Sequence, residues 1–498
     1  MAIAGIDIGT TGCKCTIYDQ EGNLISEAYR EYNAIITQEQ HLLDAHLVWE
    51  NTRAVLIEAA KKSPKIEAIG VTSFGEAAIL LNKDGIPLVP SMLYTDPRGE
   101  MQCNKLIEHF GKDYLARSTG LNPSSMYSIS KIMWLKDQKQ EVFEKCKSIC
   151  LFEDYIVYML SGIRQIDYSL ASRTMAFDIN SLQWNEEILE YAGIDKKLFS
   201  TVVPIGSKAG NIRKELAIEL GINGDAIIVS GCHDQIAAAI GTGVYKVGMA
   251  VDGTGTVECI TPVFDGNIES QRLYGGSYAI VPFLDNNYVT YAFSFTGGAL
   301  LKWYRDKLAF MEAEVAAKLG KNVYDMFDEQ VDYSKPSGLL VLPHFAGAAT
   351  PYMDNESKGA IIGLTTDTRN CDIYQALMEG VTYEMYINIE KLADAGINIE
   401  KIRATGGGAT SKLWLQMKAD ILYKPVISLG AAQSGTLGCI MLAGLACGIY
   451  NSMEEAEKIF IQERDTYYPN SQKHEEYKKI YRKYKKLYNA VKLVLTAE

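Results

Sequence analysis

Acidic, glycine and threonine residues lie together near the amino terminus, in the run Asp7-Ile8-Gly9-Thr10-Thr11-Gly12, which Lys14 follows. Glycines at positions 9 and 12 let the backbone turn closely enough for amides and threonine hydroxyls to surround a phosphate. A carboxylate beside a phosphate is unfavourable unless a cation intervenes, so Asp7 implies a magnesium ion held largely through water. The same residues are equally compatible with a plain hairpin turn, and they match neither Walker A nor a dinucleotide-binding turn.

A second turn of this kind occurs about half a chain later, at Asp252-Gly253-Thr254-Gly255-Thr256. It lies between two runs with strand character, residues 247–251 and 257–261. Two such hairpins predict two domains of related topology, each with a phosphate-facing turn, around a cleft. We place the boundary near Tyr245, which gives domains over residues 1–244 and 245–498.

Asp234 is a candidate general base. It follows a buried strand predicted over residues 226–230 and precedes a helix of small residues, where a substrate hydroxyl could donate a hydrogen bond to it. The alternative is that Asp234 caps this helix, which is a common use of aspartate. Its neighbour His233 and the pair Cys13 and Cys15 are interpreted as packing residues, since no second cluster with metal-ligand spacing accompanies them.

The elements that must position these residues alternate between strand and helix. The sequence predicts a hairpin over residues 2–19, a helix over 49–61, a buried strand over 66–72, a helix-rich stretch over 99–160 and a further helix and turn over 184–198. This alternation predicts an α/β fold.

The last predicted helix, over residues 473–495, has one apolar stripe. The stripe consists of Tyr477, Tyr481, Tyr484, Tyr488, Val491 and Leu495. The opposite face is rich in lysine, which could indicate a nucleic-acid or membrane surface; we interpret it as a solvated face of a helix whose tyrosines pack on the body.

Composition narrows the class of protein. The length of 498 residues predicts two to four domains. The net charge of -12 disfavours nucleic acid or an anionic membrane as a partner. The ten cysteines are not densely spaced and no signal peptide is visible, so we expect reduced thiols and a cytoplasmic protein. Residues 425–453 carry no charge and are long enough to cross a bilayer, but glycines interrupt the run, which predicts a buried helix packed on a sheet.

Several motifs, in this order along the chain, resemble those of a known family. The run from Gly5 to Lys14 is similar to the first phosphate motif of the actin, Hsp70 and sugar-kinase superfamily, and the run from Ser230 to Gly241 resembles the segment that bears the catalytic aspartate in FGGY carbohydrate kinases. Further matches are Tyr94-Thr95-Asp96-Pro97-Arg98, Thr296-Gly297-Gly298, Ala404-Thr405-Gly406-Gly407-Gly408-Ala409 with Ser411 and Trp414, and Gly435-Thr436-Leu437-Gly438. The resemblance covers nearly the whole chain.

This resemblance implies two actin-like, ribonuclease H-like domains around an interdomain cleft, with sugar binding in residues 1–244 and nucleotide binding in residues 245–498. The implied reaction transfers the γ-phosphoryl group of ATP to a hydroxyl of a small sugar, with Mg²⁺. A homodimer is compatible with this assignment.

The resemblance also implies roles for individual residues. Asp234 becomes the base, and Asp7 and Asp234 become the magnesium residues, largely through water. The residues expected at the nucleotide are Thr10, Thr11, Lys14, Gly253, Thr254, Gly255, Thr256, Gly298, Gly407, Gly408 and Ser411. A glycine run can also be a plain flexible loop, and Asp252 stands where the family has a small residue, so it departs from the usual second phosphate loop.

The substrate depends on residues 73–76, Ser73-Phe74-Gly75-Glu76. Xylulose kinases have a Gln-Met-His pattern in this place and glycerol kinases a Gln-Arg-Glu pattern; here Gly75 replaces the bulky or basic middle residue and leaves Glu76 as the polar contact. The residues expected at the sugar are Glu76, Phe74, Asp234, Gln235 and Asp96. Alternatively, Glu76 pairs with a structural arginine such as Arg98.

A later run does not distinguish between these substrates, because the family's Gly-Glu-Arg-Thr-Pro is here Gly347-Ala348-Ala349-Thr350-Pro351. The predicted substrate is a xylulose-like ketopentose, with a sugar alcohol or aldonate such as glycerol or gluconate as the alternative. A hypothesis of another class is a non-catalytic actin-like protein that binds ATP or a sugar.

Overall fold

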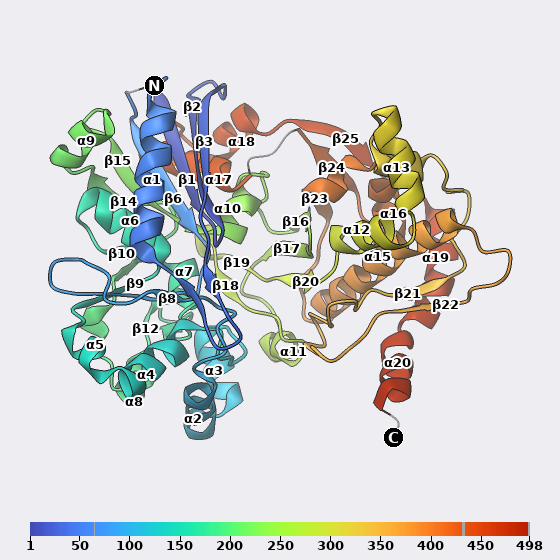
Figure 1. Ribbon diagram of the computed structural model, residues 1–498, viewed down its shortest axis with the longest axis horizontal. Helices are drawn as coiled ribbons and strands as arrows, with labels where there is room; N and C mark the ends of the chain where they lie inside the picture. The colour runs from blue at the N-terminus through green and yellow to red at the C-terminus, as the bar shows by residue number, and fades with distance from the viewer. Residues whose placement is uncertain (64, 431–433, 497–498) are drawn as a thin grey trace. The chain divides into compact units, whose positions relative to one another are not determined.

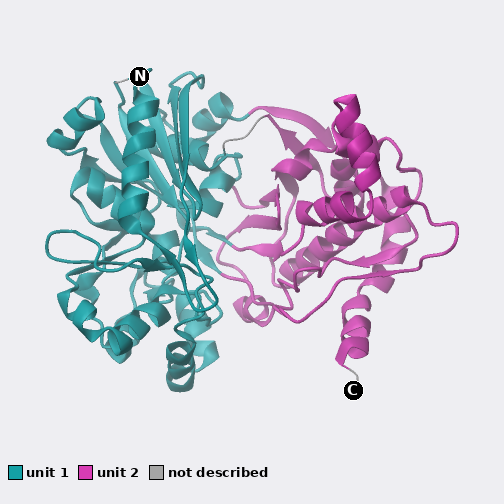
Figure 2. Cartoon of the chain, in the orientation of Figure 1, with its two compact units in different colours: residues 1–245, 280–289, 433–461 teal, residues 246–279, 290–432, 462–498 magenta. Residues whose placement is uncertain are grey.

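The computed structural model describes residues 1–63, 65–430 and 434–496. The chain forms two compact units (Figure 2). The first contains Met1–Tyr245, Ile280–Val289 and Gln433–Ile461, and the second contains Lys246–Ala279, Thr290–Ala432 and Gln462–Glu498. The predicted boundary near Tyr245 coincides with the first passage of the chain from one unit to the other.

A six-stranded sheet is the centre of the first unit, with strand order β14-β15-β6-β1-β2-β3 (Figure 1). Its strands are β1 (Ala2–Ile8), β2 (Gly12–Asp19), β3 (Leu24–Glu31), β6 (Ala68–Ser73), β14 (Ser207–Asn211) and β15 (Ile227–His233). β1, β6 and β15 are parallel, whereas β1, β2 and β3 form antiparallel hairpins. The predicted hairpin and the two predicted buried strands are therefore confirmed.

Helices cover both faces of this sheet. α1 (Ala45–Ala60) and α6 (Phe152–Ser161) share one hydrophobic core with alternate residues of β1 and β6. The opposite face contacts α10 (Asp234–Ile240) and α17 (Ser434–Ala446). The remaining helices of this unit are α2 (Glu100–Phe110), α3 (Lys112–Thr119), α4 (Ser128–Gln138), α5 (Gln140–Lys145), α7 (Tyr168–Ser172), α8 (Glu186–Ala192), α9 (Lys214–Leu220), α18 (Met453–Phe460) and the short η1 (Lys196–Leu198) and η2 (Leu284–Asn286).

α17 explains the uncharged stretch near the carboxyl end. Small residues let it approach the sheet so closely that a Cβ at Gly70 would lie 2.5 Å from the carbonyl oxygen of Cys439. The prediction of a buried helix packed on a sheet is confirmed for the described residues, whereas residues 431–433 lie outside them. Within the described ranges, no helix is both long enough and apolar enough to span a bilayer. The predicted domain over residues 245–498 includes this helix. In the structure the helix packs on β1 and β6 and therefore belongs to the first unit.

The second unit repeats the arrangement of a hairpin beside a parallel strand. β16 (Met249–Thr254) and β17 (Glu258–Phe264) form the hairpin, and β16 also pairs in parallel with β23 (Lys401–Thr405). β24 (Val426–Leu429), β25 (Glu463–Tyr467) and β20 (Ala292–Ser294) extend this sheet. In the first unit β1, β2 and β6 have the same relation, so the predicted internal repeat is confirmed.

Helices pack around this second sheet and bury many aromatic residues. They are α12 (Gly298–Lys307), α13 (Phe310–Leu319), α14 (Val323–Asp328), α15 (Asn370–Asp394), α16 (Lys412–Leu422), α19 (Ser471–Tyr484) and α20 (Leu487–Thr496). The last predicted helix is in fact two, α19 and α20. Its tyrosine stripe is confirmed, because Tyr477, Tyr481 and Tyr484 are buried, but Leu495 is 55% exposed and does not belong to it.

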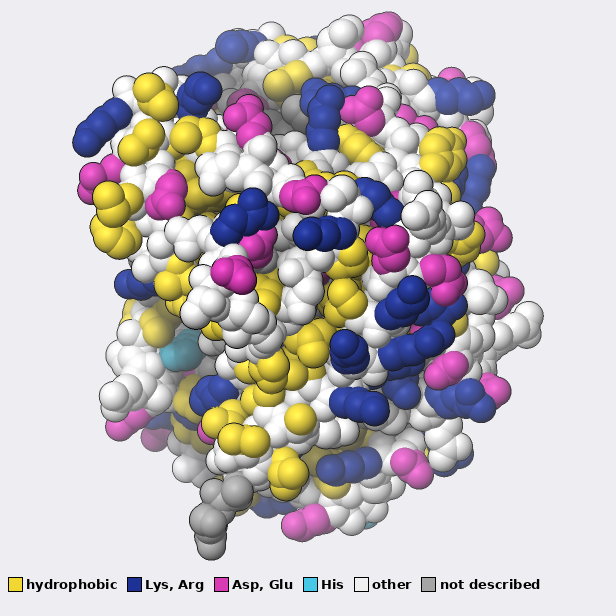
Figure 3. All heavy atoms as spheres, turned by 90° about the vertical axis from the view of Figure 1, so that its right-hand side faces the viewer, with side chains coloured by type: hydrophobic (Ala, Val, Ile, Leu, Met, Phe, Trp, Pro, Cys, Tyr) yellow, Lys and Arg dark blue, Asp and Glu magenta, His cyan; other side chains and the backbone are white. Residues whose placement is uncertain are grey.

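Lysines of these last helices pair with acidic residues. Lys485 lies 3.3 Å from Glu390, and Lys492 lies 2.8 Å from Asp354. The face drawn in Figure 3 likewise intersperses cationic with anionic side chains. This mixture is typical of a solvated surface.

Candidate active site

The first phosphate-facing turn connects β1 and β2. Asp7 lies opposite Lys14 in the hairpin, and the amide of Gly9 donates to the carbonyl of Gly12 at 2.9 Å. Burial raises the pKa of Asp7 to about 6, and Lys14 opposes this shift. Thr10 and Thr11 remain accessible at the tip. The turn therefore presents hydroxyls to solvent above a half-buried carboxylate.

Two contacts hold this turn that the sequence did not indicate. The buried Tyr32 hydroxyl donates to the carbonyl oxygens of Gly9 and Gly12, at 2.6 and 3.1 Å. The start of α17 lies so close that a Cβ at Gly435 would be 2.5 Å from Asp7 Oδ2, which explains the glycine of that motif.

Asp234 is the first residue of α10, directly after β15. His233 holds the N-cap position, and Asp234 Oδ1 accepts a hydrogen bond from the amide of Gln235 at 2.6 Å, an arrangement that does not favour the capping alternative. Burial, Asp7 and Glu76 raise the pKa of Asp234 to about 8. Its side chain nevertheless keeps 30% of its surface exposed, so the carboxyl group is accessible.

The ring of His233 lies beside this carboxyl group, with Nε2 3.2 Å from Asp234 Oδ1. Burial and the charge of Arg173 hold the pKa of His233 well below its usual value, so the imidazole is neutral. A neutral ring is suited to orienting a carboxyl group rather than to neutralising it.

Glu76 pairs with Arg173, a residue that the sequence did not single out. Arg173 Nε donates to Glu76 Oε1 at 2.5 Å, and the guanidinium lies 5.2 Å from the centre of the Tyr127 ring. The suggestion that Glu76 meets an arginine is thus correct in kind but wrong in the residue. The two partners are 97 positions apart, so no local sequence pattern indicates that they pair.

Arg98 instead binds Asp96. Its Nε and Nη2 donate to the two Asp96 oxygens at 2.8 and 2.7 Å, and the amide of His41 also donates to Asp96 at 2.8 Å. The Asp96 carboxylate has no exposed surface, which favours a role in holding its loop over a direct contact with substrate. Phe74 is buried against Phe152, with ring centres 4.9 Å apart, whereas Gln235 is exposed.

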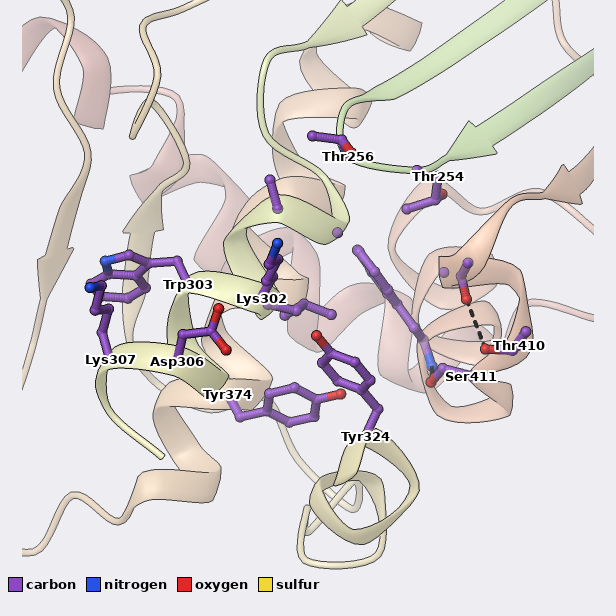
Figure 4. A pocket seen from close by; sticks show the side chains of 17 residues that line it. Thr254, Thr256, Lys302, Trp303, Asp306, Lys307, Tyr324, Tyr374, Thr410 and Ser411 are labelled. Carbon is purple, nitrogen blue, oxygen red and sulfur yellow. Dashed lines mark hydrogen bonds between the residues drawn. The ribbon is translucent and has the colours of Figure 1, made fainter. Parts of the chain in front are cut away.

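A cavity of about 740 Å³ lies in the second unit (Figure 4). Seven of the predicted nucleotide residues line it: Thr254, Gly255, Thr256, Gly298, Gly407, Gly408 and Ser411, the last at the start of α16. Gly253 does not line it, because it is a strand residue paired with Thr405. A cavity of this size is typical of small-molecule sites.

Aromatic walls that the sequence did not indicate complete the cavity. Trp303 projects from α12, and the phenol rings of Tyr324 and Tyr374 lie next to each other below it (Figure 4). Trp414 forms a further wall. Flat apolar surfaces of this kind suit a heteroaromatic base.

Two glycines of the triple run, Gly406 and Gly408, serve close packing rather than flexibility. A Cβ at Gly408 would lie 2.5 Å from Thr254 Cγ2, and one at Gly406, where φ is +86°, would lie 2.6 Å from the Thr254 carbonyl oxygen. The glycines thus let η3 (Gly407–Thr410) lie directly on the end of β16.

Asp252, the unusual acid of the second turn, points away from this cavity. Its Oδ2 lies 2.5 Å from Lys418 Nζ, which also contacts Glu258 at 3.1 Å and donates to Thr254 Oγ1 at 2.6 Å. All three ionisable side chains are buried. We call Asp252, Glu258 and Lys418 the buried triad. It contacts the second turn through the hydrogen bond from Lys418 to Thr254.

Asp328 connects three elements around the cavity. Its carboxylate accepts hydrogen bonds from Ser411 at 2.7 Å and from Tyr374 at 3.0 Å, so α14, α15 and α16 are tied together.

Comparison with known proteins identifies the family. Residues 2–241 match the N-terminal domain, and residues 277–447 the C-terminal domain, of the FGGY family of carbohydrate kinases. The chain belongs to this family. It is therefore a phosphotransferase that acts on an alcohol group of a carbohydrate, and the family uses ATP as the phosphate donor.

Individual relatives differ in their substrates. The chain is 28% identical to a xylulose kinase of Bacillus subtilis (strain 168) over 504 residues, covering 99% of this chain and 98% of the relative. It is 30% identical to a glycerol kinase of Janthinobacterium sp. (strain Marseille) over 474 residues, covering 91% of each. The crystal structure of gluconate kinase from Lactobacillus acidophilus superposes with a TM-score of 0.87 at 25% identity, covering 98% of both chains. The predicted two-domain actin-like α/β fold is confirmed.

Proposed function

We propose that this FGGY kinase phosphorylates a neutral keto sugar, a xylulose-like ketopentose, with Asp234 as the general base. The observation that carries the proposal is the acidic surrounding of Asp234, whose pKa is raised by burial, Asp7 and Glu76. In the described part of the chain, the two cations nearby, Arg173 and Lys14, already lie beside Glu76 and Asp7 and so leave no free positive charge for a substrate carboxylate. A substrate carboxylate would add to this repulsion, so the charge favours a neutral sugar or polyol over an aldonate.

In the proposed reaction, Asp234 accepts the proton of the sugar hydroxyl while that oxygen forms a bond to the γ-phosphorus and the bond to the ADP oxygen breaks. His233 keeps the carboxyl group oriented. The residues around the large cavity hold the nucleotide: Thr254, Gly255 and Thr256 at its phosphates and the aromatic walls at its base.

Asp7 and Asp234 suit Mg²⁺ in their chemistry. Both offer carboxylate oxygens, the ligands that this ion prefers, and each is an acid whose pKa is raised, so a cation nearby would stabilise both in the ionised form. When bound, the ion supplies positive charge to the phosphoryl group in transfer.

A substrate panel tests this proposal. The protein is incubated with magnesium-ATP and separate ketopentoses, ketohexoses, polyols and aldonates, and each product is identified by mass and NMR. The expected result is the highest kcat/KM with a neutral ketopentose. Preference for an aldonate over every neutral sugar would overturn the charge argument.

The family comparison favours this enzyme over the non-catalytic binding protein, because FGGY domains match most of the chain and Asp234 keeps an accessible carboxyl group. A gluconate-type substrate remains the second candidate because one cation, Arg173, does lie at the site.

A further inference from the structure

Gly75 and Arg173 occupy one small volume of the first unit. Arg173 follows α7, and its side chain crosses directly over Gly75. A Cβ built at Gly75 would lie 2.8 Å from Arg173 Cγ and 3.1 Å from Arg173 Cβ, closer than such atoms pack. A larger residue at position 75 and an arginine in this conformation at position 173 therefore exclude each other.

Arg173 uses this space to bring its guanidinium to Glu76. The pair is joined by the bond from Nε to Oε1 at 2.5 Å, and only 9% and 5% of the two side chains are exposed. Glu76 has a φ of +68°, which is unusual for a residue other than glycine and is retained only where the surroundings enforce it. The ring of Tyr127 beneath the guanidinium adds a second contact that fixes Arg173.

The pair also belongs to the predicted sugar site. The charge of Arg173 acts on both His233 and Asp234, and Glu76 acts on Asp234 and on the half-exposed Tyr94. A change at either partner therefore alters the charge that the substrate meets.

We propose that Arg173, admitted by Gly75, is the specificity-determining positioning residue of the sugar site: it fixes the Glu76 carboxylate and balances its charge, so that the site accepts neutral polyhydroxy substrates. This inference rests on the proposed function. An arginine only donates hydrogen bonds and a carboxylate only accepts them, so the pair matches adjacent hydroxyl or carbonyl groups of a keto sugar or polyol. Removal of one partner leaves the charge of the other uncompensated.

The test compares Arg173→Met with Glu76→Gln, each assayed on the best neutral sugar and on gluconate. Arg173→Met leaves Glu76 unbalanced, so the ratio of kcat/KM for gluconate to that for the neutral sugar should fall by roughly tenfold, the change that a free-energy difference of about 1.4 kcal/mol produces. Glu76→Gln removes the carboxylate charge opposite Arg173, so the same ratio should rise by roughly tenfold. Both variants should raise the KM for the neutral sugar and leave the KM for ATP within about twofold.

The opposite signs distinguish this inference from a purely structural pair, which would lower activity on both substrates by one factor. Arg173→Lys keeps the charge and should keep the parent's ratio, while Gly75→Ala forces the arginine stem away and should act as a weaker Arg173→Met. The surface pair Arg30 and Glu58, 3.5 Å apart in the same unit, supplies the matched control through Arg30→Met and Glu58→Gln.

Equal shifts of both substrates in Arg173→Met and Glu76→Gln would overturn the inference, as would an equal rise in the KM for ATP. If Arg173→Met does not fold, judged by circular dichroism, Arg173→Lys and Glu76→Gln decide the question. If the parent protein phosphorylates no carbohydrate of the panel, the proposed function fails instead, which separates the two results.

Discussion

Replacement of Lys418 by methionine tests the buried triad beneath the second phosphate turn. The ammonium lies 2.5 Å from Asp252 and 3.1 Å from Glu258, with the two acids and the lysine all at most 1% exposed. Burial opposes the charge on Lys418, but the two acids outweigh it and raise its pKa. Methionine keeps an unbranched side chain, one heavy atom shorter, and removes the charge and its hydrogen bonds.

The expected loss of stability follows from the burial. Burial and Asp252 raise the pKa of Glu258 to about 8, so at pH 7 the triad is one lysine cation, one Asp252 anion and one neutral Glu258. Lys418→Met leaves Asp252 as an unpaired buried anion, which costs about 3–5 kcal/mol. For a domain of about 150–250 residues, this lowers the Tm of the second unit by roughly 6–20 °C.

Nucleotide binding should weaken as well. Lys418 donates to the Thr254 hydroxyl at 2.6 Å, and Thr254 lines the cavity proposed to hold the nucleotide. Loss of this charge-assisted bond loosens the turn, and we expect a roughly tenfold higher Kd for Mg-ADP. Calorimetric titration measures the Kd, and differential scanning calorimetry measures the Tm.

Lys412→Met is the matched control, because Lys412 is on the same helix, 82% exposed and 3.9 Å from Asp465. It should change stability by less than about 0.5 kcal/mol. A Tm of Lys418→Met as high as that of Lys412→Met would refute the reasoning about the triad.

The same triad predicts a pH dependence with a definite sign. The raised pKa of Glu258 means that the folded state keeps a proton that the unfolded state releases above about pH 4.5. The contribution of this group is therefore full below pH 4.5 and is lost as the pH rises towards about 8. Glu258→Gln cannot ionise and should lose less stability than the parent between pH 6 and pH 9 in urea unfolding. Parallel curves would contradict this assignment.

Three further substitutions address the sites themselves. Asp234→Asn should lower kcat by about 100-fold or more while sugar binding is largely retained, and turnover within a few-fold of the parent would mean that Asp234 is not the base. Gly408→Ala places a Cβ 2.5 Å from Thr254 Cγ2, so the KM for ATP should rise while the KM for the sugar stays constant; an unchanged KM for ATP would count against the close packing of the two loops. Asp328→Ala removes the acceptor of Ser411, at 2.7 Å, and should raise the Kd for Mg-ADP by roughly tenfold, whereas Asp332→Ala, at an exposed acid nearby in sequence, should not.

The sequence predicts the features that depend on near neighbours. The hairpins at Asp7 and Asp252, the strand before Asp234 and the tyrosine stripe of α19 each arise from a run of residues whose spacing matches one element. The residues expected at the nucleotide were named from the resemblance of these runs to the family motifs, because glycine and threonine at a strand end fit a plain hairpin turn equally well.

Features that join distant parts of the chain were not predictable in this way. Glu76 and Arg173 are 97 positions apart, and Asp252 and Lys418 are 166 positions apart. Arginine and lysine are mostly found at the surface, so the sequence predicts an exposed position for Arg173 and for Lys418. Only the packing of the folded chain shows that each is the buried partner of an acid. The aromatic residues Trp303 and Tyr324, which line the cavity, were not predictable either, because their spacing in the sequence is that of ordinary core residues.

The return of α17 to the first unit has a consequence for synthesis on the ribosome. The glycines of β1 and β6 that α17 covers are synthesised early, whereas α17 itself begins only at Ser434. At about 5–20 residues per second, translation from Tyr245 to the end of α17 takes roughly 10–40 s. During this interval the nascent first unit lacks the helix that packs on β1 and β6, so we expect a half-length chain not to fold as an independent domain.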